Sequence, residues 1–240
     1  MPKILQKWTI LPHGTLEEID DGILTVTGDV PMPLGNFPRR MTVVRLTRNR
    51  TAIFSAIAQP EPAMERIEAL GKPSILIVPN PGHRLDAKIW KDRYPDIRVL
   101  TPPGARDAVM EVVPVDATTD VLDDPDADFV IVPGTQDRES AMVVRRLRRT
   151  TVITNDIIGN TQHVHGFGAQ VMARLLRWGV SGPSVPRTAR FFVKDRAALA
   201  AQLREWAALP DLRRIIVSHG DSIDDDPAGT LLRLADDYAR

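Results

Sequence analysis

The order of the hydrophobic segments predicts an α/β fold of four layers (αββα), in which two mixed β-sheets pack face to face and helices cover their outer faces. Three short segments rich in β-branched residues open the chain at 23–27, 41–46 and 51–57, with no helical pattern between them. From residue 74 onward, strand-like and helix-like segments alternate. A doubly wound parallel sheet is the rival fold. The opening β-meander argues against it, as does the lack of a Gly-rich phosphate loop after the first strand.

The bulk composition is that of an ordinary globular protein, and it excludes several classes of function. The 240 residues suffice for a large core, and no long linker is visible, so we expect residues 1–240 to form a single domain. The 31 basic and 31 acidic residues balance, which provides no overall field for nucleic acid or a membrane. The absence of cysteine excludes disulfides and thiolate sites and fits a cytoplasmic location. We expect no signal peptide and no membrane helix, since no apolar run approaches ~20 residues.

Turn and helix signals place the remaining elements in order. Residues 31–38 are rich in proline and are predicted to form an irregular loop, whereas 48–50 favour a hairpin turn. A helix is predicted over 63–70, where apolar side chains recur on one face and Gly71 follows. The same reasoning predicts strands at 74–79, 98–100, 129–132, 141–144, 151–154 and 215–217, and helices at 86–94, 106–110, 167–178, 196–208 and from 227 onward.

Two charged segments and one helical stripe need interpretation. Residues 116–128 contain six aspartates and are predicted to form a solvated loop. The basic cluster at 145–149 favours a hairpin turn or a solvated face over an anion-binding site. Helical spacing places Val171, Leu175 and Trp178 together on one side of their helix.

Histidines and aspartates follow several of the predicted strands. His83 and Asp86 follow one strand, Asp156 follows a second, and His219 follows a third. A rigid strand aims a polar loop at one point, so these positions suit metal ligands and catalytic carboxylates. The four residues would suit a hard or borderline metal ion.

Each candidate also has a purely structural interpretation. His83 and Asp86 could hold one ion together, but taken alone they are more typical of a surface loop residue and a helix N-cap. Asp156 could bridge metals or act as a base, or it could bond to its own backbone in a turn. His219 could be a ligand or a proton carrier, or it could cap the next element.

Three further histidines carry less weight. His163 and His165 alternate, as metal-binding pairs on strands do, but their neighbours are typical of a loop. They rank below His219 and could line a pocket beside it. His13 has no partner in view.

The order of these segments resembles the metallo-β-lactamase superfamily over most of the chain. The first metal motif of that family, H-x-H-x-D-H, overlies residues 81–86. His83 then matches its second histidine, and Asp86 stands in the place of its third. Asp156 matches the bridging aspartate of the family, and His219 matches its last histidine. The likeness looks closest to a branch that has lost parts of the metal motif.

The chain departs from the family pattern at several ligand positions. Pro81 replaces the first histidine, and Leu85 replaces the aspartate that binds the second metal. The next family histidine should fall within 134–140, where this chain has none. Glu139 or Asp137 could substitute for it, or neither could.

The resemblance implies metal-assisted hydrolysis with one divalent ion, zinc, manganese or iron, held by His83, Asp86, Asp156 and His219. Asp156 and His219 are the expected catalytic residues, and the attacked bond would be an ester, amide or phosphoester. The alternative is a non-catalytic binding or interaction protein that keeps the scaffold and holds no metal. The missing ligands favour this alternative, and the retained ones favour the metal. A small-molecule ligand is compatible with either hypothesis, and we expect no nucleic acid or membrane partner.

Overall fold

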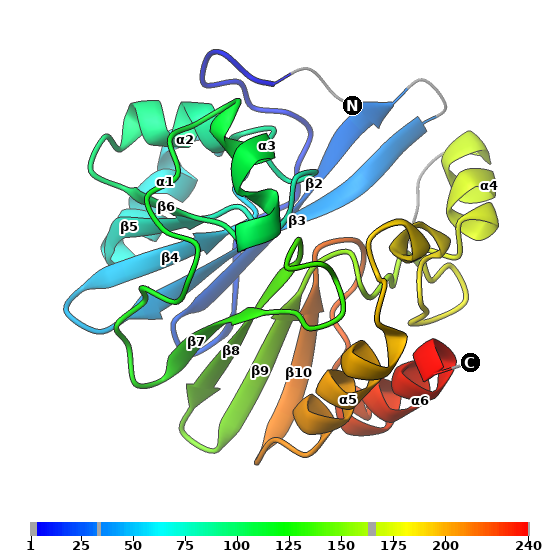
Figure 1. The fold of residues 1–240 in the computed structure, drawn as a ribbon. Helices are drawn as coiled ribbons and strands as arrows, with labels where there is room; N and C mark the ends of the chain where they lie inside the picture. The colour runs from blue at the N-terminus through cyan, green and yellow to red at the C-terminus, as the bar shows by residue number, and fades with distance from the viewer. Residues whose placement is uncertain (1–3, 33–34, 163–166, 240) are drawn as a thin grey trace.

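Two mixed β-sheets face each other in the computed structural model, which describes residues 4–32, 35–162 and 167–239 (Figure 1). One sheet has six strands in the order β1-β2-β3-β4-β5-β6, and the other has four in the order β10-β9-β8-β7. The strands are β1 (Glu17–Asp20), β2 (Ile23–Met32), β3 (Gly35–Leu46), β4 (Arg50–Phe54), β5 (Lys72–Ile77), β6 (Arg98–Leu100), β7 (Ala127–Ile131), β8 (Ser140–Arg146), β9 (Arg149–Thr154) and β10 (Leu212–Val217).

Both sheets combine antiparallel and parallel pairs. Strands β1 to β4 form an antiparallel meander, and β5 and β6 then join in parallel. In the second sheet β7, β8 and β9 are antiparallel, and β10 lies parallel to β9. The predicted meander followed by alternation is therefore confirmed.

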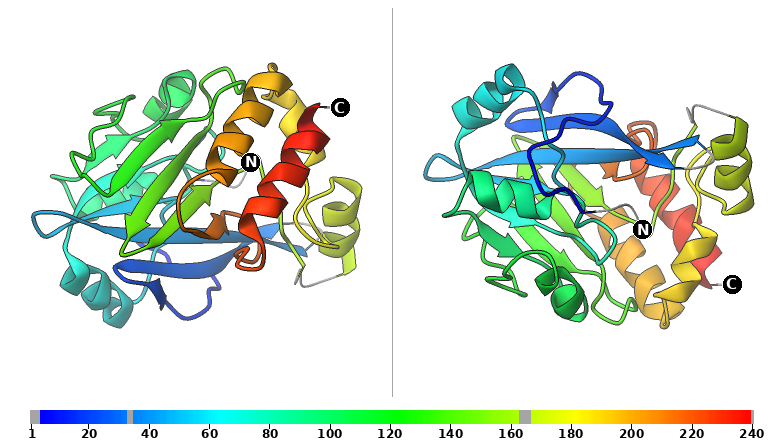
Figure 2. Two further views of the ribbon diagram at one scale, coloured as in Figure 1. Left: turned by 90° about the horizontal axis from the view of Figure 1, so that it is seen from below. Right: turned by 90° about the horizontal axis from the view of Figure 1, so that it is seen from above.

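Helices cover the outer face of each sheet, which completes the four layers (Figure 2). Apolar residues of α1, α2 and α3 pack on the six-stranded sheet, and those of α5 and α6 pack on the four-stranded sheet. A third cluster lies between the sheets, with Phe54 and Ile77 from one and Met142 and Ile153 from the other. The helices are α1 (Glu61–Leu70), α2 (Ala87–Arg93), α3 (Arg106–Met110), α4 (Phe167–Leu175), α5 (Arg196–Ala207) and α6 (Pro227–Ala239), and two 3-10 turns span Pro103–Ala105 and Arg187–Phe191.

The hairpin of β2 and β3 is longer than expected. The prediction of an irregular loop over 31–38 is wrong, because β2 and β3 remain paired up to Met32 and Gly35. Proline is tolerated here because β1 and β4 pair only with the other end of the hairpin. Pro38 therefore lies opposite Asp29 without interrupting a central ladder.

Most of the predicted apolar stripe of α4 is exposed. Val171 is 41% exposed and Leu175 is 55% exposed, whereas Trp178, which follows the helix, is buried. Helical spacing correctly indicated a helix, but it did not indicate which side chains meet the core. The equivalent stripe of α5, with Leu199, is fully buried against the second sheet.

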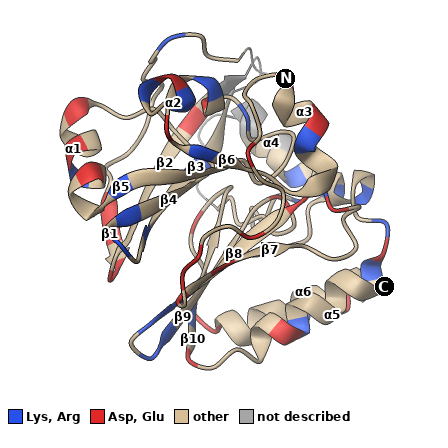
Figure 3. Ribbon diagram, turned by 60° about the vertical axis from the view of Figure 1, so that its left-hand side comes forward, with Lys and Arg blue, Asp and Glu red and all other residues tan. Residues whose placement is uncertain are grey.

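Many of the charged residues belong to the helices and to the loops and turns that connect the strands (Figure 3). The basic cluster at 145–149 forms the hairpin between β8 and β9, as predicted, and Arg145 pairs there with Asp128. In the acidic loop, Asp120 accepts hydrogen bonds from the backbone nitrogens of Leu122 and Phe129. Over the described residues, no helix combines the length and apolar character needed to cross a bilayer.

Candidate metal centre

Three strands bring the candidate residues to one end of the sandwich. His83 lies in the loop after β5, Asp156 lies two residues after β9, and His219 lies two residues after β10. Because β9 and β10 are parallel, their carboxyl ends meet at the same sheet edge. Gly220 lets the chain turn sharply after His219, since its φ is +105° and a Cβ atom there would lie 2.0 Å from the Asn160 carbonyl oxygen.

The three side chains converge as expected. His83 Nε2 lies 3.1 Å from His219 Nε2 and 3.3 Å from Asp156 Oδ1, and His219 Nε2 lies 2.9 Å from the same oxygen. Among the described residues, these three form a group whose ligand atoms lie within 4.8 Å of one another. Two ligands bonded to one zinc ion at about 2.0–2.1 Å stand about 3.3 Å apart in a tetrahedron, so the spacing is close to that of a metal site.

The hydrogen bonds around this group turn acceptor atoms toward its centre. His219 Nδ1 donates to the carbonyl oxygen of Pro38 at 2.6 Å, which assigns the proton to Nδ1. Nε2 of the neutral ring is then an acceptor, and it faces a second acceptor, Asp156 Oδ1. Two acceptors at this distance repel each other unless a proton or a cation lies between them. Either the imidazole carries a second proton and donates to Asp156, or a cation lies between the two atoms, and the second case is that of a metal site.

Ser55 contacts the imidazole of His83 at Nδ1, the ring nitrogen that does not face the group. Its hydroxyl lies 2.7 Å from His83 Nδ1, and its backbone has a φ of +56°, in the left-handed region that non-glycine residues rarely adopt. Such strained positions gather at functional sites. With Nδ1 bonded to Ser55, His83 presents Nε2 to the group, as metal-bound histidines commonly do.

Asn80 connects the loop after β5 to the carboxylates. Its carboxamide nitrogen donates to Asp156 Oδ2 at 2.7 Å and to Glu139 Oε2 at 3.0 Å. Its carboxamide oxygen accepts from the backbone nitrogens of Gly82 at 2.7 Å and His83 at 3.2 Å. One buried side chain thus fixes both His83 and Asp156. Sequence reasoning overlooked it, although it too follows a predicted strand.

The carboxyl groups of Asp156 and Glu139 have pKa values that are shifted in opposite directions. Burial raises the pKa of Asp156, but the charge of His83 and hydrogen bonds from both imidazoles outweigh burial and hold that pKa well below its ordinary value of 3.8. Burial raises the pKa of Glu139 well above its ordinary value, and the charge of Asp156 adds to this effect. Burial also lowers the pKa of His83, with Asp156 opposing the shift. Asp156 is therefore the available anion.

Asp86 does not join the group, which corrects the expected pairing with His83. Its carboxylate is fully buried, forms an ion pair with Arg39, and accepts a 3.0 Å hydrogen bond from the backbone nitrogen of Ala58. The side chain does not cap α2 either. The spacing of His83 and Asp86 was compatible with one shared ion. Arg39 reaches Asp86 from β3, however, and the ion pair between them occupies the carboxylate.

The remaining candidates lie behind the group or elsewhere. Glu139 is buried and accepts hydrogen bonds from Asn80 and from the backbone of Asp156, so it supports the site without facing its centre. His13 pairs with Gly28 in a β-bridge and bonds to its own loop. His163 and His165 lie outside the described residues.

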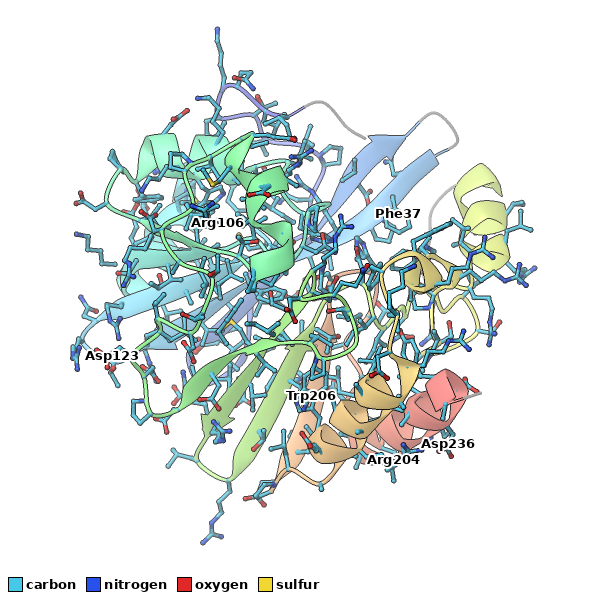
Figure 4. All side chains as sticks on the ribbon, in the orientation of Figure 1. Phe37, Arg106, Asp123, Arg204, Trp206 and Asp236 are labelled. Atoms are coloured by element: carbon cyan, nitrogen blue, oxygen red, sulfur yellow. The ribbon has the colours of Figure 1, made fainter. Side chains whose placement is uncertain are left out.

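A cavity of about 290 Å³ opens on the three side chains. Phe37 lies on β3 beside the segment that carries α4 (Figure 4), and its ring contacts those of His219 and Trp178 with centroids 4.7 and 5.3 Å away. The cavity is lined by Ile4, Val30, Phe37, Arg39, Ser55, Ala56, Gly82, His83, Arg84, Leu85, Asp156, Trp178 and His219. A larger hollow of about 520 Å³ lies at the β8–β9 hairpin and contains none of the three.

Comparison with known proteins shows similarity of structure alone. No family model matches the chain, and no curated sequence matches it. A metallo-β-lactamase from Erythrobacter litoralis is similar with a TM-score of 0.63 and 15% identity, over 92% of this chain and 96% of that one. VMB-1 has a TM-score of 0.63 at 11% identity, over 97% and 100%. The metallo-β-lactamase FIM-1 from Pseudomonas aeruginosa, in its mono-zinc form, has a TM-score of 0.59 at 15% identity, over 95% and 96%. The chain therefore has a metallo-β-lactamase-like fold.

Proposed function

We propose that the chain is a metal-dependent hydrolase that holds one divalent ion through His83 Nε2, Asp156 Oδ1 and His219 Nε2. The convergence of these three acceptor atoms, with separations of 2.9–3.3 Å, carries the proposal. Two imidazoles and one carboxylate suit zinc, manganese or iron. Three protein ligands leave a coordination position open for water, as catalytic sites require.

The ion, when bound, would lower the pKa of a water molecule enough for it to attack an ester, amide or phosphoester bond. The chain's own residues supply the orientation. The Pro38 carbonyl holds His219 in the Nδ1–H tautomer, and Asn80 holds Asp156. The low pKa of Asp156 makes it a ligand and counter-charge at neutral pH rather than a strong base.

The second candidate function is a non-catalytic protein that binds a small molecule in the same cavity. The replacements at Pro81 and Leu85 favour it, because neither side chain can ligate. The two candidates differ in whether a metal ion binds and whether hydrolysis depends on that ion.

Thermal melting with added zinc, manganese and iron tests the proposal. An ion that binds only the folded state raises the melting temperature. We expect a rise for the wild type, none for Asp156→Ala, and an unchanged rise for His13→Ala, since His13 lies outside the group. The melting should be followed by hydrolysis assays on chromogenic ester, amide and phosphoester substrates. A rise without hydrolysis would favour the binding protein, and no rise with any metal would contradict the metal site.

A further inference from the structure

The candidate ligands come from both sheets, so their spacing depends on how the sheets are held together at this end. His83 follows β5 of the six-stranded sheet, whereas Asp156 and His219 follow β9 and β10 of the four-stranded sheet. Asn160 holds the loop after β10 within its own half of the molecule. Its backbone nitrogen donates to the His219 carbonyl at 3.2 Å, and its carbonyl accepts from the Asp221 nitrogen at 2.9 Å. A contact from the other sheet is needed to fix this loop relative to His83.

Arg40 of β3 makes such a contact. Its Nη2 donates to the Gly220 carbonyl oxygen at 2.7 Å, and its Nη1 donates to Thr25 Oγ1 on β2 at 3.1 Å. Side chains alternate between the two faces of a strand, so Arg40 shares its face of β3 with Val44, a member of the apolar cluster between the sheets. The guanidinium therefore reaches from the six-stranded sheet across the inner space to the loop of His219.

The surroundings of Arg40 fix its side chain. The residue is 8% exposed, and two acceptors hold the planar guanidinium at once. Burial lowers the pKa of Arg40, and the charge of Asp221 opposes that shift. Hydrogen bonds from a charged donor are roughly twice as strong as those between neutral groups. The bond to the Gly220 carbonyl is therefore a strong connection between the two sheets.

A second contact from β3 acts on the imidazole and not on the loop backbone. The carbonyl of Pro38, two residues before Arg40, accepts from His219 Nδ1 and orients the ring. The ring can keep this bond only while the loop backbone stays beside β3. Arg40 holds that backbone at Gly220, where the chain turns directly after His219. The two contacts therefore have separate tasks.

We propose that Arg40 is a positioning residue, which holds the loop after β10 against β3 so that His219 and His83 meet at the spacing of two ligands of one ion. The inference rests on the proposed function for the purpose of this spacing, but the spacing can be measured without a metal. It gives a role at the site to a side chain that is not among those lining the cavity.

Solution NMR of the metal-free full chain measures the spacing directly. The ring centroids of His83 and His219 lie 5.0 Å apart, so the wild type should show a nuclear Overhauser cross-peak between the two rings. Arg40→Met keeps most of the side-chain length without the donors and should lose this cross-peak. Arg40→Lys keeps a cationic donor and should restore it. The matched control is Thr25→Val, which removes the other acceptor of Arg40, leaves the Gly220 contact and should keep the cross-peak.

Three results would overturn the inference. One is a cross-peak of wild-type intensity in Arg40→Met, and another is its absence from the wild type. The third is equal loss in Arg40→Met and Thr25→Val, which would show that general loosening of this core moves the rings. If Arg40→Met does not fold, the wild type provides the test. The Nη protons of Arg40 should give resolved signals, because a guanidinium held by two acceptors does not rotate freely, and averaged signals would contradict the proposed role.

Zinc binding separates this inference from the proposed function. Competition with a chromophoric chelator, at a temperature below the melting transition of each protein, gives the dissociation constants. We expect about tenfold or weaker binding in Arg40→Met, and wild-type affinity in Thr25→Val. A wild type that shows the cross-peak but binds no metal would contradict the proposed function and leave the role of Arg40 in the spacing intact. Wild-type zinc affinity in Arg40→Met would contradict the role of Arg40.

Discussion

Asp86 and Asp156 place carboxylates at the same end of the fold, yet their surroundings give them different roles. Asp86 is fully buried against Arg39, and burial raises its pKa although Arg39 offsets part of the effect. Asp156 is 20% exposed at the cavity and faces two imidazoles, which lower its pKa. A carboxylate with a fixed cationic partner stabilises the fold, whereas one that faces two imidazole nitrogens at a cavity can bind a cation from solution together with them.

The largest expected effect is on stability at Asp86. Asp86→Ala leaves the Arg39 guanidinium buried without a counter-charge, which should lower the free energy of unfolding by about 3–5 kcal/mol. Urea unfolding of the metal-free protein measures this change. Asp156→Ala should cost less under the same conditions, because Asp156 has no guanidinium partner. An equal cost at both positions would remove the distinction between them.

The next effect separates the two carboxylates by their response to metal. Zinc at 100 times its dissociation constant should stabilise the wild type by about 2.7 kcal/mol. Asp156→Ala should abolish this gain, and Asp86→Asn should retain it, because Asp86 lies outside the ligand group. Melting temperatures with and without zinc test both. Loss of the gain in Asp86→Asn would place that residue at the metal after all.

A smaller effect is expected from the side chain that holds Asp156. Asn80→Ala removes the hydrogen bonds to Asp156 and to the loop of His83, so zinc should bind about 10–100 times more weakly. Competition with a chromophoric chelator gives the dissociation constants. His13→Ala is the matched control and should keep wild-type affinity. If Asn80→Ala binds zinc as tightly as the wild type, the ligands are oriented by other contacts.

The smallest effect is in the pH dependence of the metal-free protein. The folded-state pKa of Asp156 lies below its ordinary value of 3.8, so its carboxylate contributes stability above that value, which is lost as the pH falls through the folded pKa. The stability advantage of the wild type over Asp156→Asn should therefore shrink on acidification from pH 6 to pH 3. The raised pKa of Asp86 predicts the opposite sign for Asp86→Asn. Urea unfolding at several pH values measures both trends.

Sequence patterns predicted the sandwich because its signals are local. The strand before His83 and the helix stripe with Leu199 are each visible within a few residues, and both are buried as expected. The part of the β2–β3 hairpin that contains Pro38 was missed because proline usually indicates a loop. Proline is compatible with a strand at an unpaired edge, and the sequence does not show that β3 has such an edge there. Exposure of Val171 was missed because periodicity does not tell which face meets the core.

Part of the site could also be predicted, because some of its signals are local as well. His83, Asp156 and His219 follow strands, and parallel pairing brings strand ends together. The role of Asp86 depends on Arg39, which is 47 positions away in the chain, and no local pattern reports that contact. The contribution of Ser55 depends on a left-handed backbone conformation after β4, which its residue type does not indicate.

Metal stoichiometry tests the central claim most directly. The protein is prepared without chelator or affinity-tag metal, its metal content is measured by elemental analysis, and zinc is then titrated into the wild type and Asp156→Ala. We predict one tightly bound ion per wild-type chain and none in the variant, because His83, Asp156 and His219 form one group of ligands among the described residues. Two tight equivalents, or one that persists in Asp156→Ala, would contradict this account.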